Sequence, residues 1–243
     1  MSTAPIAELG ARPGHEEEHG AGARRMFQRI APTYDRLNGL LSAGLDARWR
    51  HRAVQELALV SPGPVLDLCA GTMDLTAALA RDRPGERLVA VDFAEAMLET
   101  GRSKAPQAEV IVADATALPF ASATFAAVVC GFGMRNLADV RRGAEEVRRV
   151  LAPGGLFVTL EFFRPSRPGA RLLHATYAKI VLPAVGGWLS GDRAAYGYLA
   201  RSMGGFLRRV EYEALLATVG FDRIRGFDLT FGVASIVCAE VRR

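Results

Sequence analysis

The stretch "VLDLCAGTMDLTAAL", residues 65–79, combines a short apolar run, a turn with one glycine and the start of a helix. Glycine turns between a strand and a helix are typical of nucleotide sites, because the backbone approaches the ligand closely there. A dinucleotide site carries a glycine triad, whereas this turn offers Gly71 flanked by Asp67 and Asp74. Each carboxylate beside a diphosphate would cost about 1 kcal/mol even when hydrated. The turn therefore favours a cationic ligand without phosphate.

Outward from this stretch, apolar runs alternate with amphipathic segments. We expect strands over 64–70, 87–93, 109–115, 125–133 and 156–163, and helices over about 73–81, 94–105 and 138–151. Continuous apolar strands separated by such helices predict a parallel sheet that is covered on both faces.

The alternation changes near the C-terminus. A helix is expected over 211–220, followed by two strands, 221–230 and 234–241, whose short connection predicts antiparallel pairing. The predicted fold is therefore α/β and Rossmann-like, with a mostly parallel seven-stranded sheet in which the last strand is antiparallel.

Length and composition predict one folded domain. The chain has 243 residues, of which 50% are hydrophobic and 23% charged. We expect a disordered tail over 1–25 and a single domain over 26–243, with a helical lid at 26–59, interrupted by Pro32 and Gly39, and a helical insertion at 164–208.

Charge and hydropathy narrow the class of partner. The net charge of +4 is small and dispersed, and no basic run is interleaved with aromatic residues, so no nucleic-acid partner is expected. The longest apolar run, Val181 to Leu189, is far shorter than the roughly 20 residues that span a bilayer. No signal pattern precedes the lid, which predicts a cytoplasmic protein. The three cysteines fall within apolar runs without metal-ligand spacing, so they are interpreted as reduced core residues, and no metal site is expected.

Polar residues end the predicted parallel strands. In an open parallel sheet, ligands bind beyond the carboxyl ends of the strands, so these residues are the candidates for a site. They are Asp67 and Gly71, Asp92, Asp114, the segment Gly131 to Asn136, and Glu161. Asp92 lies 21 residues after Gly71, the spacing at which an acid reaches ribose hydroxyls. S-adenosylmethionine has a ribose for Asp92, an adenine for Asp114 and a cationic amino-acid part for the Asp67 loop.

The motifs "DLCAGT", "VDF", "ADATALPF" and "RVLAPGG" together resemble a class I S-adenosylmethionine-dependent methyltransferase. The flanking segments are similar to the ubiquinone/menaquinone-biosynthesis C-methyltransferases of the UbiE/MenG type. These segments are "YDRLNGLLSAGLDARW" (34–49), "FGMRNLADV" (132–140), "RRVLAPGGLFVTLEF" (148–162) and "YGYLARSM" (196–203). The likeness runs from about Met26 to the C-terminus.

The resemblance implies S-adenosylmethionine as cofactor and a prenylated quinol as acceptor, with demethylmenaquinol converted to menaquinol. It implies cofactor contacts at Asp67, Gly71, Thr72, Asp92, Asp114, Ala115 and Gly131, and substrate contacts at Tyr34, Asp35, Asn38 and Glu161. It also implies catalytic residues at Arg135 and Asn136. Asp46, Asp35 or a water molecule held by Asp92 are the candidate proton acceptors. Peripheral contact with the inner face of the membrane and a homodimeric state stay open.

Arginine is a poor base because its guanidinium stays protonated, so the expected role of Arg135 is to stabilise a developing phenolate. The chain departs from the family's usual residues at Leu37, Asp46, Met73, Ala152 and Phe163. Met73 begins the predicted helix, where its side chain either points away from the cofactor or narrows the methionine site. Another phenolic or polyketide-like acceptor, methylated on oxygen or carbon, therefore remains an alternative, as does a cofactor-binding accessory protein. The missing glycine triad argues against a nicotinamide dehydrogenase.

Overall fold

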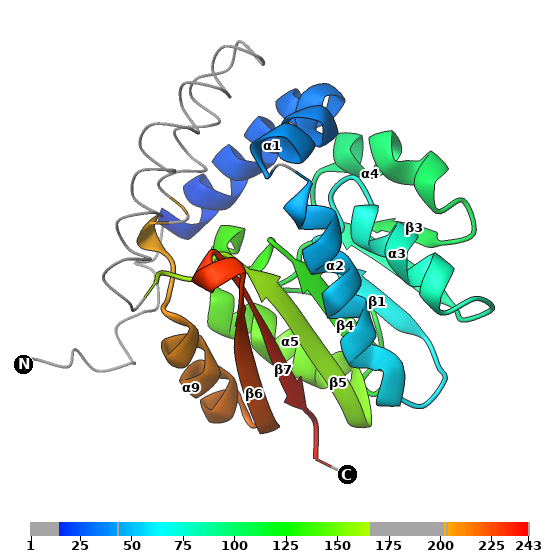
Figure 1. The fold of residues 1–243 in the computed structure, drawn as a ribbon, viewed down its shortest axis with the longest axis vertical. Coiled ribbons are helices and arrows are strands. Elements are labelled where there is room, and N and C mark those ends of the chain that lie inside the picture. The colour runs from blue at the N-terminus through cyan, green and yellow to red at the C-terminus, as the bar shows by residue number, and fades with distance from the viewer. Residues whose placement is uncertain (1–14, 43, 166–201, 203, 243) are drawn as a thin grey trace, which may run out of the picture.

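The computed structural model describes residues 15–42, 44–165, 202 and 204–242. A twisted seven-stranded sheet forms its centre, with helices on both faces (Figure 1). The strands follow the order β3-β2-β1-β4-β5-β7-β6. Their bounds are β1 Val65–Leu68, β2 Leu88–Asp92, β3 Glu109–Val112, β4 Phe125–Gly131, β5 Leu151–Glu161, β6 Asp222–Leu229 and β7 Ala234–Glu240. The predicted α/β fold is confirmed.

The helices provide the covering layers. Their bounds are α1 His15–Leu41, α2 Leu45–Gln55, α3 Asp74–Asp82, α4 Glu95–Gly101, α5 Val140–Val150 and α9 Arg209–Val219. Short 3-10 turns lie at η2 Glu56–Leu59, η3 Arg102–Lys104, η4 Met134–Asn136 and η6 Thr230–Gly232. One apolar core packs α2 and α3 against the sheet, and a second packs α5 and α9 against the opposite face.

The first five strands run parallel, so their carboxyl ends lie along one edge. β1 is buried at every position between β2 and β4, with Leu66 opposite Val89 on one side and Val128 on the other. A strand covered on both faces has no polar side to present, which explains the unbroken apolar run in the sequence. The residues that follow β1, β2 and β4 are thereby brought together.

The last strand is the reversed one, as predicted. β7 pairs antiparallel with both β5 and β6, so it lies between them and not at the sheet edge. The short connection through η6 sends the chain back along β6, and β7 thus becomes the inner of the two strands (Figure 1).

The N-terminal segment differs from the prediction in two ways. α1 begins at His15, so the boundary expected between tail and lid at residue 25 is too late. The helix also continues through Pro32 and Gly39, which were expected to interrupt it. Proline removes one backbone hydrogen bond, but Ala31 is buried against α4, and this packing compensates for the loss.

Other boundaries shift by a few residues. α5 ends at Val150, and β5 starts at once at Leu151, earlier than the predicted strand, because the "PGG" turn is incorporated into the strand. In the expected insertion at 164–208, residues 166–201 lie outside the described part of the chain. No helix within the described ranges is long and apolar enough to cross a membrane.

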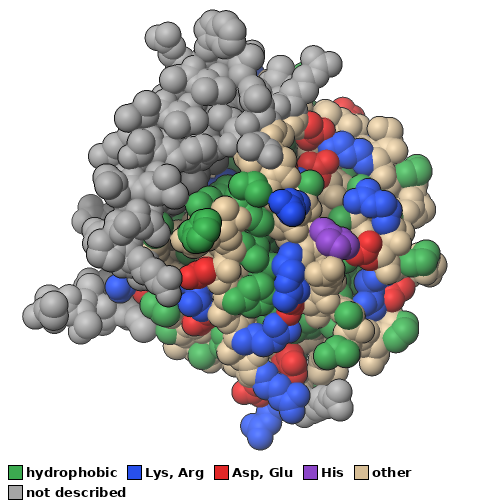
Figure 2. Space-filling model, viewed as in Figure 1, with side chains coloured by type: hydrophobic (Ala, Val, Ile, Leu, Met, Phe, Trp, Pro, Cys, Tyr) green, Lys and Arg blue, Asp and Glu red, His purple; other side chains and the backbone are tan. Residues whose placement is uncertain are grey.

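Charged side chains of both signs lie on the face shown in Figure 2, and Lys and Arg side chains gather in a column near its middle. Acidic side chains lie beside this column. Glu56, for example, is paired with both Arg52 and Arg225.

Candidate active site

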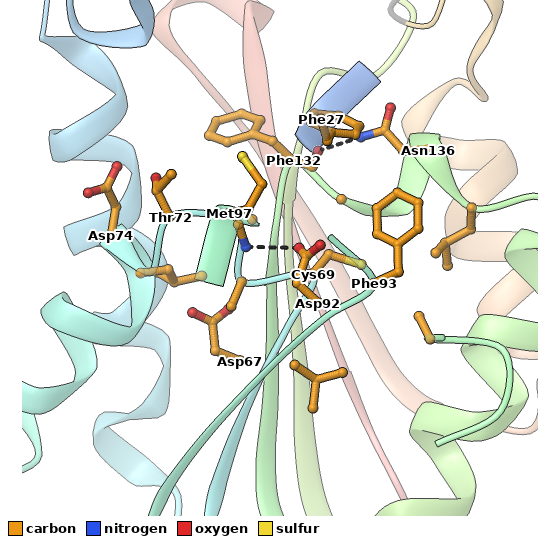
Figure 3. A pocket seen from close by; sticks show the side chains of 18 of the residues that line it. Phe27, Asp67, Cys69, Thr72, Asp74, Asp92, Phe93, Met97, Phe132 and Asn136 are labelled. Atoms are coloured by element: carbon orange, nitrogen blue, oxygen red, sulfur yellow. Dashed lines mark hydrogen bonds between the residues drawn. The ribbon is translucent and has the colours of Figure 1, made fainter. Parts of the chain in front are cut away.

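A pocket that is open to solvent lies at the carboxyl edge of the parallel strands. It is formed by the residues that follow β1, β2, β3 and β4, with α1 contributing to its wall. All seven residues predicted to contact a cofactor line it: Asp67, Gly71, Thr72, Asp92, Asp114, Ala115 and Gly131. In Figure 3, Asp67 and Asp92 lie near the strands, while Phe27, Phe132 and Asn136 lie on the opposite side of the pocket.

Asp92 fixes the shape of the loop after β1. Its Oδ2 accepts a hydrogen bond of 2.9 Å from the Gly71 N–H, and its Oδ1 accepts one of 2.9 Å from the Ala94 N–H. Gly71 has φ +54, a conformation that glycine adopts without a Cβ penalty. Burial raises the pKa of Asp92 to about 6, although the backbone N–H groups act to lower it.

Asp67 is a buried carboxyl group with a spare acceptor. Its Oδ2 accepts a hydrogen bond of 2.5 Å from Thr76 Oγ1, while its Oδ1 has no hydrogen-bond partner among the described residues. Burial raises the pKa of Asp67 to about 7, with a further contribution from the negative charge of Asp92 and against the Thr76 hydrogen bond. A buried acceptor without a partner is costly, and a bound cation or N–H donor would relieve that cost.

Met73 points away from the pocket. It is fully buried in the core beside Leu79 and Leu98, and it is absent from the pocket lining. Its backbone is left-handed, with φ 62, at the residue that precedes α3. The thioether therefore leaves the space above Gly71 open, and of the two orientations considered from the sequence the outward one is found.

The lid helix α1 covers one side of the pocket. Tyr34 and Phe27 line the pocket, and Phe27 packs edge-on against Phe93 with ring centroids 6.1 Å apart. Asp35 does not line the pocket but binds the pocket loop, accepting a hydrogen bond of 2.5 Å from Thr72 Oγ1. Asn38 lies in α1, and its side chain is outside the described part of the structure.

Asp46 lies in α2, away from the pocket lining. It accepts hydrogen bonds from Ser42 Oγ at 2.7 Å and from Arg50 at 2.6 Å. Burial acts to raise the pKa of Asp46, but the Ser42 hydrogen bond and the Arg50 charge outweigh it and lower the pKa. A carboxylate held in this way is a weak base, so the geometry argues against Asp46 as the proton acceptor.

Arg135 and Glu161 form a buried ion pair. Arg135 Nη1 lies 2.6 Å from Glu161 Oε1, and the two side chains are 3% and 0% exposed. Neither residue lines the pocket, whereas the neighbouring Asn136 does. The predicted roles of Arg135 toward a phenolate and of Glu161 as a pocket residue therefore lack direct contact with the described cavity.

Sequence reasoning missed several lining residues. Cys69 and Met97 line the pocket, and so does Arg50, which lies 3.3 Å from Asp74. Phe132 also lines it, within the predicted segment Gly131 to Asn136. Cys69 follows β1 directly, so the rule of strand ends could have identified it. Cys69 was instead interpreted as a core residue; a hydrogen bond with Cys130 and burial raise the pKa of its thiol.

Comparison with known proteins agrees with this geometry. The family model described as the ubiE/COQ5 methyltransferase family matches residues 15–240. The chain belongs to this family. This methyltransferase is 45% identical to a demethylmenaquinone methyltransferase from Thermus thermophilus. The match extends over 215 residues and covers 87% of this chain and 97% of that protein. It is 42% identical to a ubiquinone/menaquinone biosynthesis C-methyltransferase from Geobacter sulfurreducens, covering 92% of this chain and 90% of the relative.

The fold of this methyltransferase also matches solved structures. A SAM-dependent methyltransferase from Thermotoga maritima superposes with a TM-score of 0.67 at 16% identity, covering 90% of this chain and 99% of the other. Membership of the family and this shared fold imply S-adenosylmethionine as the methyl donor. The unpartnered Asp67 oxygen and the acids at the strand ends fit such a cationic ligand better than a diphosphate.

Proposed function

We propose that this methyltransferase transfers a methyl group from S-adenosylmethionine to a ring carbon of a prenylated quinol, with demethylmenaquinol as the acceptor and menaquinol as the product. The family and the two relatives named above support the quinol. The single observation that carries the proposal is the buried acidic pocket floor, where one oxygen of Asp67 has no hydrogen-bond partner among the described residues.

We assign the cofactor contacts by the chemistry of each lining residue. Asp92 would accept hydrogen bonds from ribose hydroxyls, and Asp114 with Ala115 would contact the adenine. Asp67, with Gly71 and Thr72, would hold the cationic amino-acid part, and Gly131 would allow close approach. When bound, the donor supplies an electrophilic methyl group on a positively charged sulfur.

The acceptor must become nucleophilic at carbon. A ring carbon beside a phenolic oxygen gains electron density when that oxygen loses its proton, and a phenol has a pKa near 10 in water. Asn136 is the polar side chain of the "GFGMRN" segment that lines the pocket, so we assign it contact with the phenolic oxygen. We assign the phenolic proton to a water molecule held by Asp92, through which it would leave to bulk solvent, because Asp46 is engaged by Arg50 and Ser42.

Arg135 does not line the pocket, so it would act on the phenolic oxygen only indirectly. Its positive charge would stabilise the phenolate from a distance, and its hydrogen bond to the Phe132 carbonyl would hold the backbone of the pocket wall. Holding the acceptor carbon and the methyl group in line would supply much of the remaining rate enhancement. Since a prenylated quinol partitions into a bilayer, we also propose that the protein, acting in the cytoplasm, contacts the inner membrane face transiently.

The test is direct. Purified protein is incubated with methyl-labelled S-adenosylmethionine and, separately, with a demethylmenaquinol, a prenylated benzoquinol and a simple phenol, and the products are identified by mass spectrometry. Carbon methylation of the naphthoquinol supports the proposal, and Asp92→Ala should abolish it by removing two backbone hydrogen bonds and the ribose acceptor. Methylation of the phenol alone would overturn the quinol assignment. Asp222→Ala, at an exposed position of β6, is the matched control.

A further inference from the structure

Phe132 has an unusual backbone conformation at the end of β4. Its φ is +60, in the left-handed region that a bulky residue rarely adopts. Such strain persists only where the surroundings hold it, and it clusters at functional sites. Glycine stands on both sides of Phe132, at 131 and 133, yet the strained position itself carries an aromatic ring.

Three hydrogen bonds hold this conformation. The Phe132 N–H donates to the Leu160 carbonyl at 2.7 Å. The Phe132 carbonyl accepts a hydrogen bond from Arg135 Nη1 at 2.6 Å. It accepts another from Asn136 Nδ2 at 3.3 Å (Figure 3). Glu161 in turn holds Arg135 in a buried ion pair, which therefore stabilises the strained backbone of Phe132.

The ring of Phe132 is supported on the side away from the pocket. It stacks on Phe162 with centroids 4.5 Å apart and an interplanar angle of 26°, and it lies 6.3 Å from Trp49. Phe132 nevertheless remains half-buried and lines the pocket. Phe132 and Phe162 therefore form a rigid aromatic wall. The Arg135 guanidinium lies 5.6 Å from the centroid of the Phe162 ring and stabilises its position.

The place of this wall separates it from the proposed donor contacts. In the sheet, β2 and β3 lie on one side of β1 and carry or precede Asp92 and Asp114, whereas Phe132 follows β4 on the other side. If Asp92, Asp114 and the loop after β1 hold S-adenosylmethionine, the part of the pocket next to β4 is left for the acceptor. Two aromatic rings attract through offset stacking, which suits a flat acceptor.

We propose that Phe132 is the platform on which the flat ring of the acceptor stacks, and that the Arg135–Glu161 pair is the positioning device that holds this platform in place. The inference rests on the proposed function for the identity of the acceptor. It adds the residue that selects planar aromatic acceptors.

The experiment compares Phe132→Leu, which keeps an apolar side chain under the same backbone strain, with Phe132→Tyr, which keeps the ring. Phe120→Leu is the control, because Phe120 is also half-buried and packs on one ring, Phe125, but lies outside the pocket. Two quantities are measured: the affinity for 1,4-naphthoquinol in the presence of S-adenosylhomocysteine, by calorimetry, and KM and kcat for demethylmenaquinol.

Phe132→Leu should weaken naphthoquinol binding and raise KM by about three- to tenfold, while the affinity for S-adenosylhomocysteine stays within about twofold. Phe132→Tyr should restore binding, and Glu161→Gln should raise KM in the same direction. Unchanged naphthoquinol affinity in Phe132→Leu, or an equal loss of S-adenosylhomocysteine affinity, would overturn the platform. The calorimetry needs no turnover, so a wild-type protein that binds naphthoquinol through Phe132 but methylates no quinol would contradict the proposed function alone.

Discussion

Asp35 and Thr72, which are 37 positions apart in the chain, share a hydrogen bond of 2.5 Å between α1 and the loop after β1. Lys104 lies 2.5 Å from Asp35 and 2.6 Å from Asp74, so one lysine joins the lid helix to the start of α3. Because α1 also places Tyr34 on the pocket wall, this group of contacts keeps the lid over the cofactor site.

Replacing Lys104 by Met should therefore speed release of S-adenosylhomocysteine. Both ion pairs are partly exposed, at 26–36% of each side chain, and pairs of this kind contribute about 0.2–1 kcal/mol each. The expected increase in the dissociation rate is about two- to tenfold, measured by stopped flow. Added salt should accelerate release from the wild type more than from Lys104→Met. Arg87→Met, which breaks an exposed pair with Glu109 before β2, should leave the rate unchanged.

The unliganded protein should lose stability as pH rises from about 4 to 7. Folding raises the pKa of Asp67 from 3.8 to about 7 and that of Asp92 from 3.8 to about 6. A folded state that binds protons more tightly is stabilised at low pH, and this stability is lost as pH passes the folded pKa. Asp67→Asn should raise Tm at pH 8 by several degrees, since each kcal/mol corresponds to about 2–4 °C. Equal Tm values for both proteins at pH 8 would contradict the burial of a charged Asp67.

Affinity for the cationic donor should change with pH in the opposite direction. Protonation of Asp67 and Asp92 removes the negative charge that attracts the cation, so affinity should fall as pH drops from about 7.5 to 5.5. Calorimetric titration with S-adenosylmethionine at four pH values measures this dependence. In Asp67→Asn the remaining dependence should follow Asp92 alone, near pH 6. A flat profile in the wild type would show that neither acid meets the cation.

The buried pair predicts strong coupling between Arg135 and Glu161. Arg135→Met leaves Glu161 as an uncompensated buried charge, and such losses cost about 3–5 kcal/mol of unfolding free energy. Urea denaturation should show this loss, and Glu161→Leu combined with Arg135→Met should recover much of it. Additive effects of the two substitutions would argue that the pair is solvated. The turnover of Arg135→Met should be measured without urea and at a temperature at which the variant is folded.

Met73 sets two effects against each other. Met73→Gly relieves a left-handed backbone worth about 1–2 kcal/mol but removes a fully buried side chain worth about 2–5 kcal/mol. The variant should therefore be less stable, while its affinity for S-adenosylhomocysteine stays the same because Met73 does not line the pocket. Met73→Leu keeps volume and strain and should lie within about 1.5 kcal/mol of the wild type. Tighter cofactor binding by Met73→Gly would indicate that the thioether faces the site.

The place of the pocket at the carboxyl ends of the parallel strands could be predicted because each determinant is local. Parallel strands collect their carboxyl ends at one edge, so acids that follow separate apolar runs, such as Asp67, Asp92 and Asp114, must meet there. The reversed last strand likewise followed from a short connection. These inferences need only the type and order of the elements.

The remaining features depend on contacts between distant segments. Nothing near Lys104 in the sequence signals that Asp35 would lie against it, because the approach of α1 to α4 is set by packing. In the same way, Glu161 and Arg135 meet because β5 ends beside η4, and their roles as pocket residues were predicted without that contact. The helix before Met26 was missed because its residues lack an apolar period.

Gly101 of α4 lies directly under the pocket loop. A Cβ there would stand 2.3 Å from the Thr72 carbonyl oxygen and 2.9 Å from the Met73 Cβ. The nearest of these atoms belongs to the backbone, so the loop after β1 can lie this close to α4 only while position 101 has no side chain, whichever residue stands at position 73. Homologues that keep the same path of this loop should therefore retain glycine at the end of α4.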